Sequence, residues 1–182
     1  MKIVLGISGA SGAIYADQLL QFFKKTGQEA FVVASANGRR IFKDELGKNL
    51  DECGFPLFGP QDFNAPFVSG SVKMDALVIA PASMGTLGRI AHGISNDVLT
   101  RTADVFLKEK RKLILVPRET PFSLIHIENL KLLALAGATL IPAIPSFYSQ
   151  PKTIEDVAAT VTARVLDHLG LDNSLMKRWR ES

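Results

Sequence analysis

The sequence predicts a single α/β domain, a three-layer, doubly wound (Rossmann-like) fold whose mostly parallel sheet is covered by helices on both faces. Five short runs are apolar almost throughout, as strands buried on both faces are, and they lie at residues 2–6, 29–34, 75–80, 112–117 and 138–142. Segments with the helical spacing of apolar residues lie near 12–26, 36–46, 84–93, 95–110, 123–136 and 153–169. This alternation is typical of parallel strands joined by helical crossovers. At 182 residues, with no linker, we expect one domain over 1–182.

The first half of the chain opens with the strand KIVLG, and the turn GISGASGAIY then leads into the first helix. The run EAFVVA is the second strand, and the helix near 36–46 follows it. The stretch GFPLFGPQDFNAPFVSGS at 54–71 is dense in glycine and proline, so it is predicted to be one long irregular connection. DALVIA is the third strand.

The second half contains the strands KLILVP and ATLIP. Between the third and fourth strands, SNDVLTRTADVFLKEKRK predicts a helix that Ser95 or Asn96 caps. The buried stripe of this helix is expected to consist of Val98, Thr102, Val105 and Phe106.

Composition narrows the function classes. Hydrophobic residues make up 47% and charged residues 21%, and the mean hydropathy of +0.16 hints at buried subunit contacts. The net charge is +3, with basic residues spread along the chain, so no nucleic-acid tract is expected. Cys53 is the only cysteine, which excludes an internal disulfide and a cysteine-based zinc site and favours the cytoplasm. No apolar run reaches the roughly 18 residues that span a bilayer, and no leader precedes the first strand, so we expect no membrane segment.

Polar residues follow the strands at one edge of the predicted sheet. Ligands of doubly wound sheets bind outside the carboxyl ends of the strands. The loops at that edge are rich in small, hydroxyl-bearing and charged residues, and they lie at 6–12, 35, 81–86, 117–121 and 145–148. This edge is therefore the predicted ligand site.

The turn after the first strand has the pattern G-x-x-G-x-x-G, which differs from the G-x-G-x-x-G of dinucleotide-binding folds. The second strand ends in Ala34-Ser35, without the carboxylate that holds the ribose of NAD. Hydroxyls of Ser8 and Ser11 and free amides at the helix start suit an anion or a flavin. A plain turn in which Ser11 caps the helix fits the same residues.

PASMGTLGRI repeats this chemistry at a second strand-to-helix junction, through the hydroxyls of Ser83 and Thr86 and the amide of Gly85. Two adjacent cradles suit a mononucleotide whose phosphate and ring need separate anchors. A capped helix start explains the motif equally well.

Arg101 and Lys108 are seven residues apart, so both point along one flank of the predicted helix over 95–110 and could grip a phosphate. Ion pairs from Asp97 to Arg101 and from Asp104 to Lys108 on a solvated face are the ordinary alternative.

VPRETPFS places Arg118 and Glu119 directly after a strand of the sheet centre, where one side chain can hold a ligand and the other can move a proton. In PSFYSQP, Tyr148 lies in a proline-bounded loop that suits the presentation of a phenol. A surface turn and a half-buried tyrosine are the alternatives.

Other reactive residues lack a catalytic setting. His92, His126 and His168 have no metal-ligand spacing, and Cys53 lies in no basic environment. The absence of G-x-S-x-G and G-x-x-x-x-G-K-[ST] motifs argues against a serine hydrolase and a P-loop ATPase.

Five blocks of the sequence resemble the UbiX-type flavin prenyltransferases, whose members were formerly labelled aromatic-acid decarboxylases. The blocks are GISGASGAIY, PASMGTL, LTRTADVFLKEKRKLILVPRETPFS, GATLIPAIPSFYSQPKTIEDV and MKRWRES, and they run over nearly the whole chain. The resemblance implies a metal-independent enzyme that joins the dimethylallyl group of dimethylallyl phosphate to reduced FMN. Its product, prenylated FMN, serves a separate UbiD-type decarboxylase, in ubiquinone synthesis or for another aromatic acid.

The resemblance also assigns residues by motif. Those that would hold FMN are Gly9, Ala10, Ser11, Ser35, Ser83, Met84, Gly85, Thr86 and Arg118. Those that would hold the prenyl phosphate are Arg101, Lys108, Tyr148 and Arg164. Glu119 would be the acid/base residue, and Glu45 and Trp179 would complete the pocket. The resemblance further implies a homo-oligomer, typically a dodecamer, with sites at subunit interfaces and a C-terminal tail (about 171–182) that packs on a neighbouring subunit.

This assignment makes chemical sense of the cations. An allylic phosphate leaves as a dianion, and the sequence has no D-D-x-x-D metal-binding motif, so Arg, Lys and Tyr donors must neutralise it. We expect the allyl carbon to be captured at flavin N5 and the ring to close onto C6, with Ser11 and Glu119 as the candidates for the proton transfers.

Two alternatives remain open. Flavin-dependent cysteine decarboxylases share a related fold and a P-A-S motif, but they continue as PASANT and use a histidine base early in the chain. Here the run is PASMGT, and no histidine precedes His92. A flavin carrier without chemistry would leave five of these residues without a role: Arg101, Lys108, Glu119, Tyr148 and Arg164.

Overall fold

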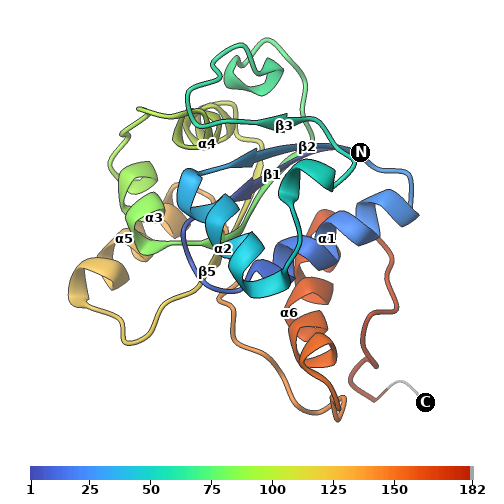
Figure 1. The fold of residues 1–182 in the computed structure, drawn as a ribbon. Coiled ribbons are helices and arrows are strands. Elements are labelled where there is room, and N and C mark those ends of the chain that lie inside the picture. The colour runs from blue at the N-terminus through green and yellow to red at the C-terminus, as the bar shows by residue number, and fades with distance from the viewer. Residues whose placement is uncertain (181–182) are drawn as a thin grey trace.

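The computed structural model describes residues 1–180 and confirms the predicted fold class. In these residues, one six-stranded sheet has the order β3-β2-β1-β4-β5-β6, and every pair of neighbours is parallel (Figure 1). The strands are β1 (Lys2–Ile7), β2 (Glu29–Ala34), β3 (Leu57–Phe58), β4 (Ala76–Ala82), β5 (Lys112–Pro117) and β6 (Thr139–Leu140). The helices are α1 (Ala13–Lys25), α2 (Ala36–Leu46), α3 (Met84–Ala91), α4 (Val98–Lys108), α5 (Leu124–Leu135) and α6 (Ile154–Leu169), with 3₁₀ turns at Leu50–Glu52 and Pro66–Val68.

Helices cover both faces of the sheet (Figure 1), so the central strands β1 and β4 are buried on both sides. One apolar cluster joins β1, β2 and β4 to α1, α6 and Phe42 of α2. A second cluster joins the other face to α3, α4, Leu133 of α5 and Phe67 of the irregular connection. None of the helices within residues 1–180 is long and apolar enough to cross a membrane.

Two sequence expectations are corrected. The connection over 54–71 contains the edge strand β3, whose two residues lie among glycines and prolines that indicate a loop. Helix α4 begins one residue after Asp97, which caps it with a capping box, rather than after Ser95 or Asn96. The predicted stripe of that helix is confirmed, since Val98, Thr102, Val105 and Phe106 are all buried.

The strand order reverses between β1 and β4, which is the position where ligands bind in this class of sheet. The loops after β1, β2, β4 and β5 therefore meet at this carboxyl edge.

Candidate active site

Ser8 holds the two central loops of the carboxyl edge together. It is fully buried, its hydroxyl donates to the carbonyl oxygen of Pro81 at 3.0 Å, and the same oxygen accepts from the Ser83 amide at 2.7 Å. Both hydrogen-bonding roles of Ser8 are thus filled within the protein, so it fixes the site and, contrary to the sequence expectation, does not face a ligand.

A carboxylate from another helix caps α1. The cap residue Gly12 has φ 109°, a conformation that favours glycine, and it has no side chain to offer. Glu45, at the end of α2, accepts from the Gly12 amide at 2.9 Å and from the Ala13 amide at 2.8 Å through Oε2. The two amides that the sequence suggested were free are therefore occupied, and Ser11 hydrogen bonds to Glu45 instead of capping the helix.

The cap determines the charge state of Glu45. Burial raises the pKa of this carboxyl, but hydrogen bonds from Ser11, Ala13 and Gly12, together with the charge of Arg118, outweigh burial and leave the pKa below its usual value. Glu45 is accordingly ionised at neutral pH and is an acceptor at the start of α1.

Ser35 and Ser83 cap the next two helices. The Ser35 hydroxyl oxygen accepts from the Gly38 amide at 3.0 Å, and the Ser83 oxygen accepts from the Thr86 amide at 3.4 Å. The capped-helix interpretation of the PASMGTLGRI motif is thus confirmed, and the cap at Ser35 was not predicted; the start of each helix still presents its positive end to the carboxyl edge.

The backbone at this edge is open to a ligand. Gly9, Ser11 and Gly85 are exposed, whereas Ala10 and Met84 are buried beneath them. A Cβ at Gly9 would lie 2.8 Å from Cβ of Asn37, but a Cβ at Gly85 would have no neighbour within 4 Å. The loops therefore present a surface of small residues, which leaves room for a flat ring and a phosphate group.

Arg118 and Glu119 border this surface on the β5 side. The Arg118 amide donates to the carbonyl oxygen of Ala82 at 3.1 Å, which ties the loop after β5 to the end of β4. Both side chains are exposed, and the Glu119 carboxylate accepts from the Thr120 amide at 3.0 Å. Burial raises the pKa of Tyr15 on α1, although the charge of Arg118 opposes this shift, which places the guanidinium near the start of α1.

Arg101 and Lys108 lie on α4, and both are paired within the protomer. Arg101 pairs with Asp104 at 2.8 Å and donates to the carbonyl oxygen of Val68 at 3.2 Å, so its ion pair is i,i+3 and not the i,i+4 pair expected for a solvated face. Lys108 pairs with Glu109 at the end of α4, just before β5 begins. The start of β5 is the amino edge of the sheet, opposite the surface of small residues.

Tyr148, Arg164 and Trp179 form a third group, beside α6. The rings of Tyr148 and Trp179 meet edge to face, with centroids 5.4 Å apart, and Arg164 donates to Asp167 at 3.0 Å. Within one chain, therefore, the predicted residues are divided among three places, and only the predicted FMN residues share one place with Glu45 and Glu119.

Sequence reasoning missed three structural partners of the predicted residues. Asn37 packs against Gly9, and Asp167 and Arg178 hold the tail on α6. None of them repeats at a helical or strand period, so no pattern pointed to them. His92 hydrogen bonds to Asn129 at 3.0 Å, which agrees with its structural interpretation, and no group of three or more His, Cys, Asp or Glu side chains within residues 1–180 could hold a metal ion.

Comparisons with known proteins agree with this architecture. The flavoprotein family model matches residues 1–166. A flavin prenyltransferase UbiX of Methanocaldococcus jannaschii is 46% identical over 182 residues, covering 98% of each chain. The crystal structure of AnUbiX (PadA1) in complex with FMN and dimethylallyl pyrophosphate superposes with a TM-score of 0.96 at 35% identity, covering 100% of this chain and 98% of that one.

A dodecameric FMN-dependent UbiX-like decarboxylase from Escherichia coli O157:H7 superposes with a TM-score of 0.95 at 37% identity, and both chains are covered completely. The chain therefore belongs to the flavoprotein family and, within it, to the UbiX-type flavin prenyltransferases.

Proposed function

We propose that this protein transfers the dimethylallyl group of dimethylallyl phosphate to reduced FMN and so makes prenylated FMN for a UbiD-type decarboxylase. One observation carries the proposal: in a chain whose nearly full-length relatives are flavin prenyltransferases, the small-residue loops, Arg118 and Glu119 meet where the strand order reverses. Reduced FMN supplies the nucleophilic nitrogen and carbon, and the protein supplies binding, charge and proton transfer.

The carboxyl edge is the proposed FMN site. The exposed Gly9 and Gly85 carry no side chain that would block a flat ring, and the starts of α2 and α3 with the Arg118 guanidinium favour an anion. The α1 amides are already bound to Glu45, so the flavin phosphate is expected at the Ser35 and Ser83 ends of the edge, where Thr86 also lies.

The prenyl phosphate requires cations, and one protomer does not bring Lys108 to this edge. Helix α4 is about 16 Å long, and Lys108 lies at its far end, so the Lys108 ammonium of the same chain cannot reach the loops after β1 and β4. We infer that Arg101 and Lys108 of one subunit complete the site of another, as sites at subunit interfaces require.

The exposed surface of α5 supports such an assembly. Four of its leucine and isoleucine side chains are about half exposed or more: Leu124 at 72%, Ile125 at 71%, Ile127 at 49% and Leu135 at 76%. A water-facing helix of this composition is typical of a subunit interface. The proposed state is a homododecamer, and the single cysteine is consistent with the cytoplasm. Whether the tail also packs on a neighbour stays a prediction, and residues 181 and 182 of that tail lie outside the described residues.

Glu119 and Ser11 are the proposed proton-transfer groups. The C–O bond of the donor breaks as phosphate leaves, and N5 loses a proton as the first new bond forms. The second bond forms as the prenyl double bond takes up a proton and flavin C6 loses one, so the site must both donate and accept protons. Glu119 is an exposed carboxyl group beside Arg118, and the Ser11 hydroxyl is hydrogen-bonded to the ionised Glu45. Either side chain is therefore placed to exchange a proton at the proposed FMN site.

The test is a mass spectrum of the flavin recovered after anaerobic incubation with reduced FMN and dimethylallyl phosphate, with and without a chelator. A mass increase of one prenyl group, unaffected by the chelator, supports the proposal. Unchanged FMN would favour a carrier. In a second incubation, with a cysteine-containing peptide in place of dimethylallyl phosphate, loss of CO₂ from the peptide would favour a cysteine decarboxylase. Glu119→Gln is expected to bind FMN normally and turn over slowly; an unchanged rate removes Glu119 from the mechanism.

A further inference from the structure

We infer that Asp167 and Arg178 form a clamp that docks the C-terminal tail (residues 171–180) on α6 and thereby positions Arg164, Tyr148 and Trp179 for the prenyl phosphate. The inference rests on the proposed function. Asp167 and Arg178 are positioning residues in it, because neither needs to touch the substrate.

The clamp is a two-point ion pair. Arg178 donates from Nη1 to Oδ2 and from Nη2 to Oδ1 of Asp167, both at 2.6 Å, and the two side chains are only 28% and 22% exposed. Such a fork fixes orientation as well as distance. Asn173 reinforces it, since its side-chain nitrogen donates to Asp167 at 3.0 Å and its carbonyl oxygen accepts from Arg178 at 3.3 Å.

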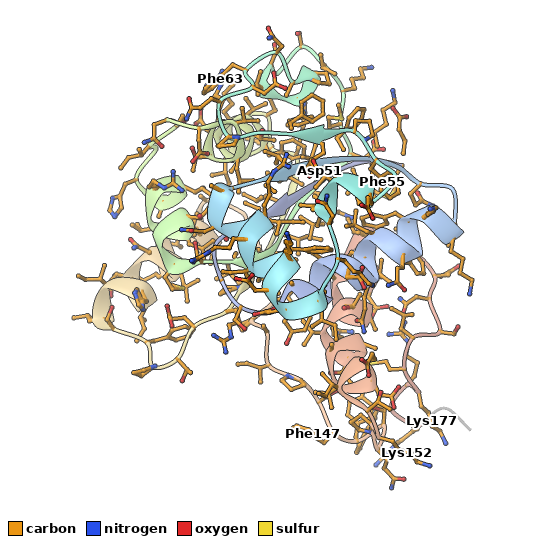
Figure 2. The ribbon with its side chains drawn as sticks, viewed as in Figure 1. Asp51, Phe55, Phe63, Phe147, Lys152 and Lys177 are labelled. Atoms are coloured by element: carbon orange, nitrogen blue, oxygen red, sulfur yellow. The ribbon has the colours of Figure 1, made fainter. Side chains whose placement is uncertain are left out.

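The residue next to this anchor is Trp179, whose ring meets Tyr148 edge to face at 5.4 Å. Trp179 is 66% exposed and Tyr148 is 43% exposed, so this contact buries too little surface to hold the tail by itself. Figure 2 shows Lys177 of the tail at the same end of the molecule as Phe147 and Lys152, which flank the Tyr148 loop. The Asp167–Arg178 pair therefore holds the two rings together.

The clamp also controls Arg164. Arg164 reaches Asp167 with Nη1 at 3.0 Å, and its side chain is 56% exposed, so a ligand can approach its guanidinium. Because Arg178 occupies both carboxylate oxygens, Asp167 orients Arg164 without binding it in a fork. If Arg178 is removed, both oxygens become available to Arg164, and its guanidinium is drawn away from the phosphate.

Trp179 is the only tryptophan of the chain and therefore reports on the tail directly. The experiment uses the full-length protein and compares Arg178→Ala, Arg178→Lys and Asp167→Asn with Lys177→Ala, which removes an exposed cation one residue away. Circular dichroism establishes that each variant is folded. Time-resolved anisotropy of Trp179 then measures tail mobility, and calorimetry measures the Kd of dimethylallyl phosphate and, separately, of FMN.

We expect Arg178→Ala to release fast local motion of Trp179 and to raise the Kd and KM of dimethylallyl phosphate about tenfold, the loss expected for one charge-assisted hydrogen bond to phosphate. The Kd of FMN should not change. Arg178→Lys should restore part of the affinity, since it keeps the charge but loses the fork. Asp167→Asn should also free Trp179, and Lys177→Ala should match the wild type.

The inference is overturned if Trp179 is as rigid in Arg178→Ala as in the wild type, or if Lys177→Ala shows the same changes. It is also overturned if Trp179 becomes mobile while the Kd of dimethylallyl phosphate stays the same, because the tail would then have no positioning role. If the wild type binds the phosphate but forms no prenylated FMN, the proposed function fails, while anisotropy and Kd still decide the clamp.

Discussion

The cap that Glu45 places on α1 can be tested by removing it. In Glu45→Ala, the Gly12 and Ala13 amides lose an acceptor at 2.9 and 2.8 Å, and Gly12 has no side chain to replace it. Removal of a helix cap costs about 0.5–2 kcal/mol, and the exposure of Glu45 favours the middle of that range, so we expect about 1 kcal/mol. For a chain of this length, such a loss lowers Tm by about 2–4 °C.

The assay is thermal unfolding at a fixed protomer concentration, because assembly would make Tm concentration-dependent. Glu45→Gln keeps an acceptor without the charge and should lose about half as much. Asp44→Ala, which removes the exposed acid beside Glu45, is the matched control and should leave Tm unchanged. Equal Tm values for Glu45→Ala and Asp44→Ala would refute the cap.

The cap also predicts a pH dependence. The pKa of Glu45 is lower in the folded protein than in the unfolded chain, so its contribution to stability is fully present above the unfolded value of about 4.3. That contribution is lost as the pH falls through the lowered folded pKa. The Tm difference between wild type and Glu45→Ala should therefore shrink in acid; a constant difference from pH 7 to pH 3 would contradict the charge state.

Three further predictions follow from packing and charge. Gly38→Ala would place a Cβ 2.5 Å from the backbone oxygen of Ile7, so it should lower both Tm and FMN affinity, measured by melting and by flavin fluorescence titration; a normal Tm would show that the loop adapts. Burial raises the pKa of Asp97, but hydrogen bonds from Thr100 and Arg89 lower it by more, so the net shift is downward. Asp97→Asn should therefore be destabilising at pH 7 and nearly neutral below the lowered pKa, and urea unfolding at both pH values measures this difference. Leu135→Glu, on a side chain that is 76% exposed, should dissociate the assembly without unfolding the chain, and light scattering that still reports the wild-type mass would exclude α5 from the interface.

Local chemistry made most of the fold predictable. Continuous apolar runs marked five of the six strands, all but β3, because a sheet covered on both faces needs apolar side chains in both directions. Strand β3 was missed because its two residues lie among glycines and prolines that indicate a loop, and the α4 cap was misplaced because Ser95, Asn96 and Asp97 are all good caps. Spacing could not choose among them.

The position of the candidate site in the fold was predictable from the sequence, but the contacts within the site were not. The loops at the carboxyl edge follow directly from strand order, so the place of Ser83, Arg118 and Glu119 at that edge was predictable. The burial of Ser8 and the use of Glu45 as a cap depend on contacts across 73 and 32 or 33 residues of sequence, and no local pattern encodes such contacts.

The sequence by itself determined the alternation of strands and helices, the edge where the loops gather and the family to which those loops belong. The tertiary structure decided which polar groups remain available to a ligand, because each hydroxyl or carboxylate that satisfies a buried amide is removed from the site. It also decided that Lys108 lies at the opposite edge from Glu119 and that Asp167 anchors the tail, since side chains distant in sequence meet only after the helices have packed.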